Sequence, residues 1–124
     1  MKQLFTLILF ISCFSYGQVN NLELSNSSGH DVYVQAHAVT NCDGSGSLST
    51  VWIPLSGYGS TTITPLSASP SYFWLIVAVW NPSDLSQQLN MTNPCSGCSI
   101  PDWDYHPDVN GYWETTDCIK IQIF

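Results

Sequence analysis

The chain has 124 residues with nine carboxylates, two lysines and no arginine, and its formal net charge is −7 at pH 7. Proteins bind nucleic-acid backbones and anionic membrane surfaces through basic side chains, so this composition argues against both partners. Hydrophobic residues make up 44% of the chain, which suffices for a packed core and argues against disorder.

The start of the chain predicts a secretory signal peptide over residues 1–17. One lysine precedes an apolar run over 4–11, which is too short for a membrane-spanning helix of about 20 residues. Ser15 and Gly17 supply the small residues that precede a cleavage point at Gln18. The Ser-Tyr-Gly-Gln ending resembles the signal peptides of secreted proteins from Gram-negative bacteria, which implies a secreted or periplasmic product.

Cleavage at this point leaves residues 18–124, a length typical of one domain. The alternative is a lipoprotein anchored through Cys13, which would attach the chain to a membrane surface without spanning it. Against it, Phe10 stands where a lipobox has a small branched residue or leucine, and Phe14 stands where a polar tether is usual.

Period-two alternation of apolar residues predicts a series of short strands in the mature chain. We expect them at 21–25, 32–39, 50–53, 60–66, 71–80, 87–92, 111–115 and 118–124. The first two, joined by a turn rich in Gly, Asn and Asp, are expected to form a hairpin. The 71–80 run is apolar on both faces and is expected to be the central strand of a sheet.

Two details of this pattern matter for the fold. Within 32–39, alternation predicts an inner face of Val32, Val34, Ala36 and Ala38 and an outer face of Tyr33, Gln35 and His37. Residues 82–92 fit either an edge strand or a short helix that turns Leu85 and Leu89 towards the core. Seven or eight short strands predict an all-β fold, a small antiparallel β-sandwich stapled by two disulfides.

The four mature cysteines are Cys42, Cys95, Cys98 and Cys118. An even number in a small exported domain predicts two disulfides. Of the three possible connectivities, we expect a local Cys95–Cys98 pair with a long-range Cys42–Cys118 pair, and the alternative crosses them. A zinc site is the competing use, but the second C-x-x-C of a zinc ribbon is missing.

The loop over 101–114 is the candidate functional site, because it is long and rich in both aromatics and carboxylates. We expect Trp103, Tyr105 and Trp113 to contact a ligand, with Asp102, Asp104 and Asp108 as polar or calcium-binding partners. Long connections in compact domains usually carry function, and aromatic content argues against disorder. The simpler interpretation is that the tryptophans plug the end of the sandwich and the carboxylates are solvated.

Two ligand classes fit the loop. A glycan would stack its sugar rings on aromatic side chains, for which the candidates are Trp52, Trp80, Trp103, Tyr105 and Trp113. Calcium would take oxygens from the three aspartates and the Asn110 amide, although the spacing departs from the helical EF-hand pattern. No other cofactor or metal is expected.

The sequence therefore predicts a secreted, non-enzymatic binding or structural module with a glycan or protein partner outside the cell. The alternative is a small glycan-active hydrolase, with Asp104 and Glu114 as its pair of carboxylates. A serine hydrolase is disfavoured because the Asp-Gly-Ser-Gly-Ser segment at 43–47 lacks the Gly-x-Ser-x-Gly spacing.

We expect the exported protein to begin at Gln18 and to carry no lipid, because a small-residue cleavage site follows a short apolar run. Intact-mass measurement of the protein recovered after export checks this. A mass that includes a diacylglyceryl group on Cys13 would establish the lipoprotein instead.

Overall fold

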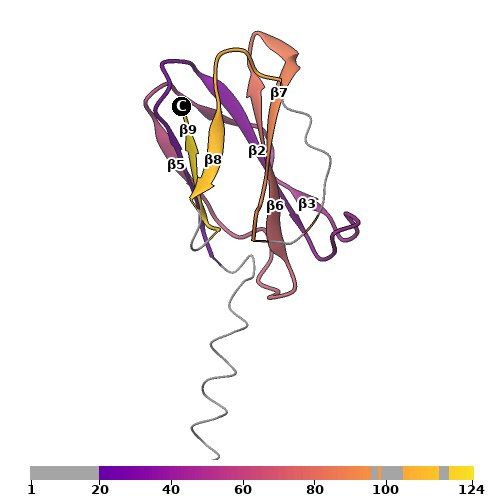
Figure 1. Cartoon of the computed structure of the whole chain (residues 1–124). Coiled ribbons are helices and arrows are strands. Elements are labelled where there is room, and N and C mark those ends of the chain that lie inside the picture. Colours follow the sequence, from indigo (N-terminus) through magenta and orange to yellow (C-terminus); the bar gives the residue numbers. More distant parts are fainter. Residues whose placement is uncertain (1–19, 96–97, 99–104, 115–117) are drawn as a thin grey trace, which may run out of the picture.

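The computed structural model describes residues 20–95, 98, 105–114 and 118–124, which form nine strands (Figure 1). The strands are β1 (Leu22–Asn26), β2 (Val32–Val39), β3 (Leu48–Ser49), β4 (Ile53–Leu55), β5 (Ser60–Ile63), β6 (Phe73–Asn81), β7 (Asp84–Thr92), β8 (Gly111–Glu114) and β9 (Lys120–Ile123). Within these ranges there is no helix, and hence none long and apolar enough to cross a membrane.

The strands form two sheets that pack as the two layers of a sandwich (Figure 1). The four-stranded sheet has the order β5-β1-β9-β8. The five-stranded sheet has the order β3-β2-β6-β7, with β4 pairing β2 on the same edge as β3. All pairings are antiparallel except β1 with β9, which is parallel. The predicted all-β sandwich with two disulfides is thus confirmed.

The expected hairpin between the first two strands is wrong, because β1 and β2 belong to different sheets. The buried side chain of Asn26 holds the connection in this shape. Its Nδ2 donates to the carbonyls of His30 and Ser56 at 2.9 and 3.2 Å, and its Oδ1 accepts from the backbone and hydroxyl of Ser28. These bonds satisfy a buried amide and turn the chain from one layer into the other.

The expected strand at 50–53 is replaced by two shorter strands, β3 and β4, on either side of a break. Thr50 causes the break, because its Oγ1 accepts a hydrogen bond from the Ala36 backbone at 2.9 Å, in place of a backbone carbonyl. Trp52 therefore lies between the two strands rather than within a ladder. The segment that could have been a helix is β7, which pairs with β6 from Asn81 to Ile76.

The core lies between the layers and confirms the inner face predicted for 32–39. Its fully buried members include Leu22, Leu24, Val32, Val34, Ala36, Ala38, Val77, Val79 and Ile123. β6 lies between β2 and β7, as expected for the run that is apolar on both faces. Its residues Trp74, Val77 and Val79 enter the core, which leaves its other face outside the sandwich.

Trp113 joins the two layers at the edge where β8 meets β7. It is 5% exposed, belongs to the core cluster, and its Nε1 donates to the Met91 carbonyl at 3.0 Å. Gly111 approaches the same residue so closely that an added Cβ would collide with the Met91 Sδ. The glycine thus allows the close contact that buries the tryptophan.

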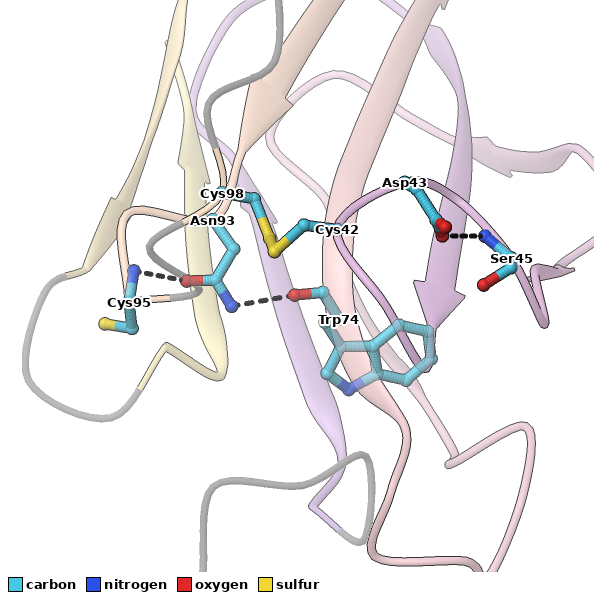
Figure 2. Close-up of a disulfide and its surroundings, with 7 residues drawn as sticks. All are labelled: Cys42, Asp43, Ser45, Trp74, Asn93, Cys95 and Cys98. Atoms are coloured by element: carbon cyan, nitrogen blue, oxygen red, sulfur yellow. Dashed lines mark hydrogen bonds between the residues drawn. A yellow bond between two sulfur atoms is a disulfide. The ribbon is translucent and has the colours of Figure 1, made fainter.

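The disulfides are Cys42–Cys98 and Cys95–Cys118, so both pairs we expected, Cys95–Cys98 and Cys42–Cys118, are wrong. Asn93 supplies the physical reason. Its Oδ1 accepts from the Cys95 backbone and its Nδ2 donates to the Trp74 carbonyl, both at 2.7 Å. In this geometry the Cys95 sulfur points away from the Cys42–Cys98 bridge (Figure 2). Two disulfides in so small a protein indicate an oxidising compartment.

Digestion without reduction should yield one peptide pair linked through Cys42 and Cys98 and another linked through Cys95 and Cys118. Mass spectrometry of the linked peptides is the measurement. Removing the Cys42–Cys98 bridge by a double alanine substitution should cost about 2 to 5 kcal/mol of stability. A peptide closed on itself through Cys95 and Cys98 would contradict the pairing.

Trp113→Ala should lower the free energy of unfolding by about 3 to 5 kcal/mol, because it removes a large core side chain and its hydrogen bond. Tyr112→Ala is the matched control on the same strand, since Tyr112 is half exposed and faces outward. Its cost should stay below about 1 kcal/mol. Chemical denaturation of both variants measures the difference, and equal costs would show that Trp113 is not a core residue.

Candidate functional site

The structure does not bring together the described members of the predicted loop site. Trp113 is in the core, where an outside ligand cannot reach it. Tyr105 is 69% exposed and pairs with Gln88 of β7. Asp108 is exposed and lies near the turn between β6 and β7. Trp103, Asp102 and Asp104 lie outside the described residues.

Asp108 lines a cavity of about 480 Å³, here called the turn cavity, beside the turn that joins β6 to β7. The other polar groups that line it include His30, Asp31 and His106. Burial lowers the pKa of His106 and nearby His30 lowers it further, although the Asp108 carboxylate opposes them. Among the described residues, no three or more metal-ligating side chains form a group that could hold a metal ion. The calcium site stays a prediction, because it depends on Asp102 and Asp104.

A second group of aromatic side chains lies on the outer face of the five-stranded sheet. This aromatic cluster consists of Tyr33 of β2, Trp80 of β6 and Trp52 from the break between β3 and β4. Tyr33 and Trp80 are direct cross-strand partners, which places both on the same face. The Trp52 ring stacks on Trp80 with centroids 5.3 Å apart and lies 5.8 Å from the Tyr33 ring.

The cluster has an accessible ring and a covered ring. Trp52 is 40% exposed, whereas the Nε1 of Trp80 is shielded from solvent and has no hydrogen-bond partner among the described residues. The break at Thr50 makes this arrangement possible, because it frees Trp52 from strand geometry. The result is one accessible aromatic ring, Trp52, supported by Trp80 and Tyr33 on the sheet beneath it.

Amide side chains continue this face beside the cluster. Gln88 of β7 is opposite Trp80, and Tyr105 is opposite Gln88, so all three share one row across the sheet. Gln35 and Asn90 stand in the next row, on either side of Ala78. Gln88 Nε2 donates to Asn90 Oδ1 at 2.6 Å, and Gln35 Nε2 donates to the Thr50 carbonyl at 3.1 Å. These bonds fix the amides in place.

At the far end of the same face is a cavity of about 530 Å³, here called the loop cavity. It is lined by His37, Val39, Cys42, Asp43, Gly44, Ser47, Leu75, Ile76, Gln88, Asn90 and Thr92. The register between β2 and β6 shifts after His37, so Leu75 has no paired residue on β2. Leu75 and Val39 are both buried yet stand outside the core cluster, so they form an apolar floor beneath the loop over 40–47.

Two titratable groups in the loop cavity have defined charge states at neutral pH. Burial lowers the pKa of His37, which favours the neutral imidazole at pH 7, and its Nδ1 is 2.8 Å from the Ser49 hydroxyl. Hydrogen bonds from Ser45 lower the pKa of the Asp43 carboxyl group and keep it ionised (Figure 2). The bond from the Ser45 backbone contributes most, and the bond from the Ser45 side chain comes next. The cavity thus has one carboxylate and neutral donors and acceptors around an apolar floor.

The outer face of the four-stranded sheet is different in kind. Its exposed residues are mostly small or charged: Glu23, Ser25, Ser60, Thr62, Glu114 and Lys120. Tyr112 is an exposed aromatic on this face, with its ring 6.0 Å from that of Phe124, but no fixed amides or cavity accompany it among the described residues. Lys120, the one lysine or arginine that the structure describes, lies there 3.9 Å from Glu23. Aromatic rings, fixed amides and a cavity together occur on the five-stranded sheet, which makes that face the candidate site.

Sequence reasoning named Trp52 and Trp80 as sugar-stacking candidates and placed Tyr33, Gln35 and His37 on an outer strand face. It missed that these residues meet, because the register of β2 against β6 depends on pairing distant in sequence. Comparisons of the sequence and of the structure find no family model, no curated protein and no solved structure that matches this chain.

Proposed function

We propose that this protein is a non-enzymatic extracellular module that binds neutral glycans through the outer face of its five-stranded sheet. The observation that carries the proposal is the aromatic cluster of Tyr33, Trp52 and Trp80 beside the amides of Gln35, Gln88 and Asn90. A sugar ring has an apolar face that stacks on an aromatic ring and hydroxyls at its edge that exchange hydrogen bonds with amides.

The charge of the chain supports a neutral ligand. The protein carries a net charge of −7, and the described residues of this face include no lysine or arginine. Carboxylated or sulfated glycans would be repelled and would find no cation to pair with. The acidic surface does not repel a neutral glycan.

Two disulfides and the predicted signal peptide support a place outside the cytoplasm, where free glycans and cell-surface glycans occur. A rigid, preformed face also suits binding, because little side-chain freedom remains to be lost when a ligand stacks. Trp52 and Trp80 already contact each other before any ligand arrives.

A glycan hydrolase is the less favoured reading of the same face. Glycosidases use two carboxylates that flank the scissile bond. Among the described residues that line the loop cavity, Asp43 alone carries a carboxylate. The turn cavity is lined by both Asp31 and Asp108, but none of its described lining residues is Trp, Tyr or Phe.

Trp52→Ala should weaken binding to neutral polysaccharides at least tenfold, equivalent to about 1.4 kcal/mol, because it removes the accessible stacking ring. Affinity electrophoresis through gels that contain soluble β-glucan, mannan or starch measures the loss. Trp52 lies outside the core cluster, so the variant should keep its fold, which its melting temperature checks.

Tyr112→Ala is the control for this test, since it removes an exposed aromatic from the outer face of the other sheet. Its retardation should match that of the unmodified protein. Equal binding by Trp52→Ala, or preference for an acidic polysaccharide such as alginate, would refute the proposed face. Release of new reducing ends by the unmodified protein would establish the hydrolase.

A further inference from the structure

The aromatic cluster and the loop cavity form one continuous track on the sheet. Gln88 is the direct partner of Trp80 and also lines the cavity. Ile76, in the cavity floor, is four residues from Trp80 along β6, a distance of about 13 Å in a strand. A glycan chain stacked on the cluster and running along β2 and β6 would therefore reach the cavity.

The loop that follows β2 borders the track at the cavity end. Cys42, Asp43, Gly44 and Ser47 line the cavity from the loop that follows β2. The Cys42–Cys98 disulfide ties this loop to the segment after β7, and the Asp43 carboxylate fixes its turn by accepting from the Ser45 backbone at 2.8 Å (Figure 2). The disulfide therefore holds the loop in place at this end of the track.

The lining of the cavity suits one sugar ring. Ile76, which is partly exposed, offers an apolar surface for the ring face, above the buried side chains of Val39 and Leu75. Polar groups around it include the neutral His37 imidazole and the Asn90 amide, which suit hydroxyls at the ring edge. Asp43 is an acceptor for a hydroxyl and repels an anionic substituent.

We infer that the loop cavity receives the terminal ring of a neutral glycan, so that the protein recognises chain ends and not chain interiors. This inference rests on the proposed function. The aromatic cluster supplies stacking for the rings that precede the terminal one, and the tied loop supplies the stop that an internal segment cannot pass.

Counting binding sites on polymers of different length tests the inference. A neutral polysaccharide that the unmodified protein binds is divided, and one portion is shortened by partial acid hydrolysis. If chain ends are recognised, the number of molecules bound at saturation per gram of polymer rises in proportion to the number of ends. If interiors are recognised, that number per gram stays constant.

Ser47→Phe is the matched variant, because it fills the cavity from an exposed position on its wall. It should weaken binding to the shortened chains at least tenfold. Ser60→Phe adds the same side chain to the outer face of the other sheet and should bind as the unmodified protein does. Melting temperatures of both variants show that the fold is kept.

The outcomes separate this inference from the proposed function. Capacity that follows polymer mass, together with unchanged binding by Ser47→Phe, overturns chain-end recognition and leaves the aromatic face as a binding site for chain interiors. Failure of the unmodified protein to bind any neutral polysaccharide overturns the proposed function and the inference with it. Capacity that follows the number of ends, lost in Ser47→Phe alone, supports both.

Discussion

The structure depends on one constraint, which is that β6 is apolar on both faces while a two-layer sandwich can bury only one of them. Trp74, Val77 and Val79 enter the core between the sheets. Leu75 and Trp80 lie on the opposite face and need another cover. The loop after β2 covers Leu75, and the ring of Trp52 covers Trp80. A loop and a single ring cover a sheet incompletely. The outer face of β6 is therefore left with the loop cavity beneath the loop and with the partly exposed ring of Trp52.

Local patterns in the sequence were enough to predict the class of fold. Alternation assigned the buried and outer faces of 32–39 correctly, because the period of a strand is a local property. The hairpin between the first two strands was wrong for a related reason: turn residues predict a change of direction but not which sheet the chain enters. Here the buried bonds of Asn26, one of them to Ser56 far along the chain, decide that question.

The disulfide pairing and the site were harder to predict, since both depend on contacts between distant residues. The spacing of Cys95 and Cys98 suggests a local bridge. In the structure, the Asn93 side chain holds the Cys95 backbone, and the Cys95 sulfur points away from the Cys42–Cys98 bridge (Figure 2). The aromatic cluster requires Trp52 to leave its strand, and the Thr50 bond to Ala36 that causes this is invisible to alternation. The density of aromatics at 101–114 predicted a ligand-binding loop, but its Trp113 lies in the core.

The parallel pairing of β1 with β9 has a consequence for how the protein comes into being. Glu23 pairs with Lys120 and Asn26 with Ile123, and β9 also pairs with β8. The four-stranded sheet is therefore incomplete until β9 joins β1 to β8. β9 leaves the ribosome after all the other strands of the described residues. A nascent chain therefore lacks a completed four-stranded sheet until β9 has emerged. Completion of the sandwich, and closure of the Cys95–Cys118 disulfide just before β9, therefore follow the emergence of this strand.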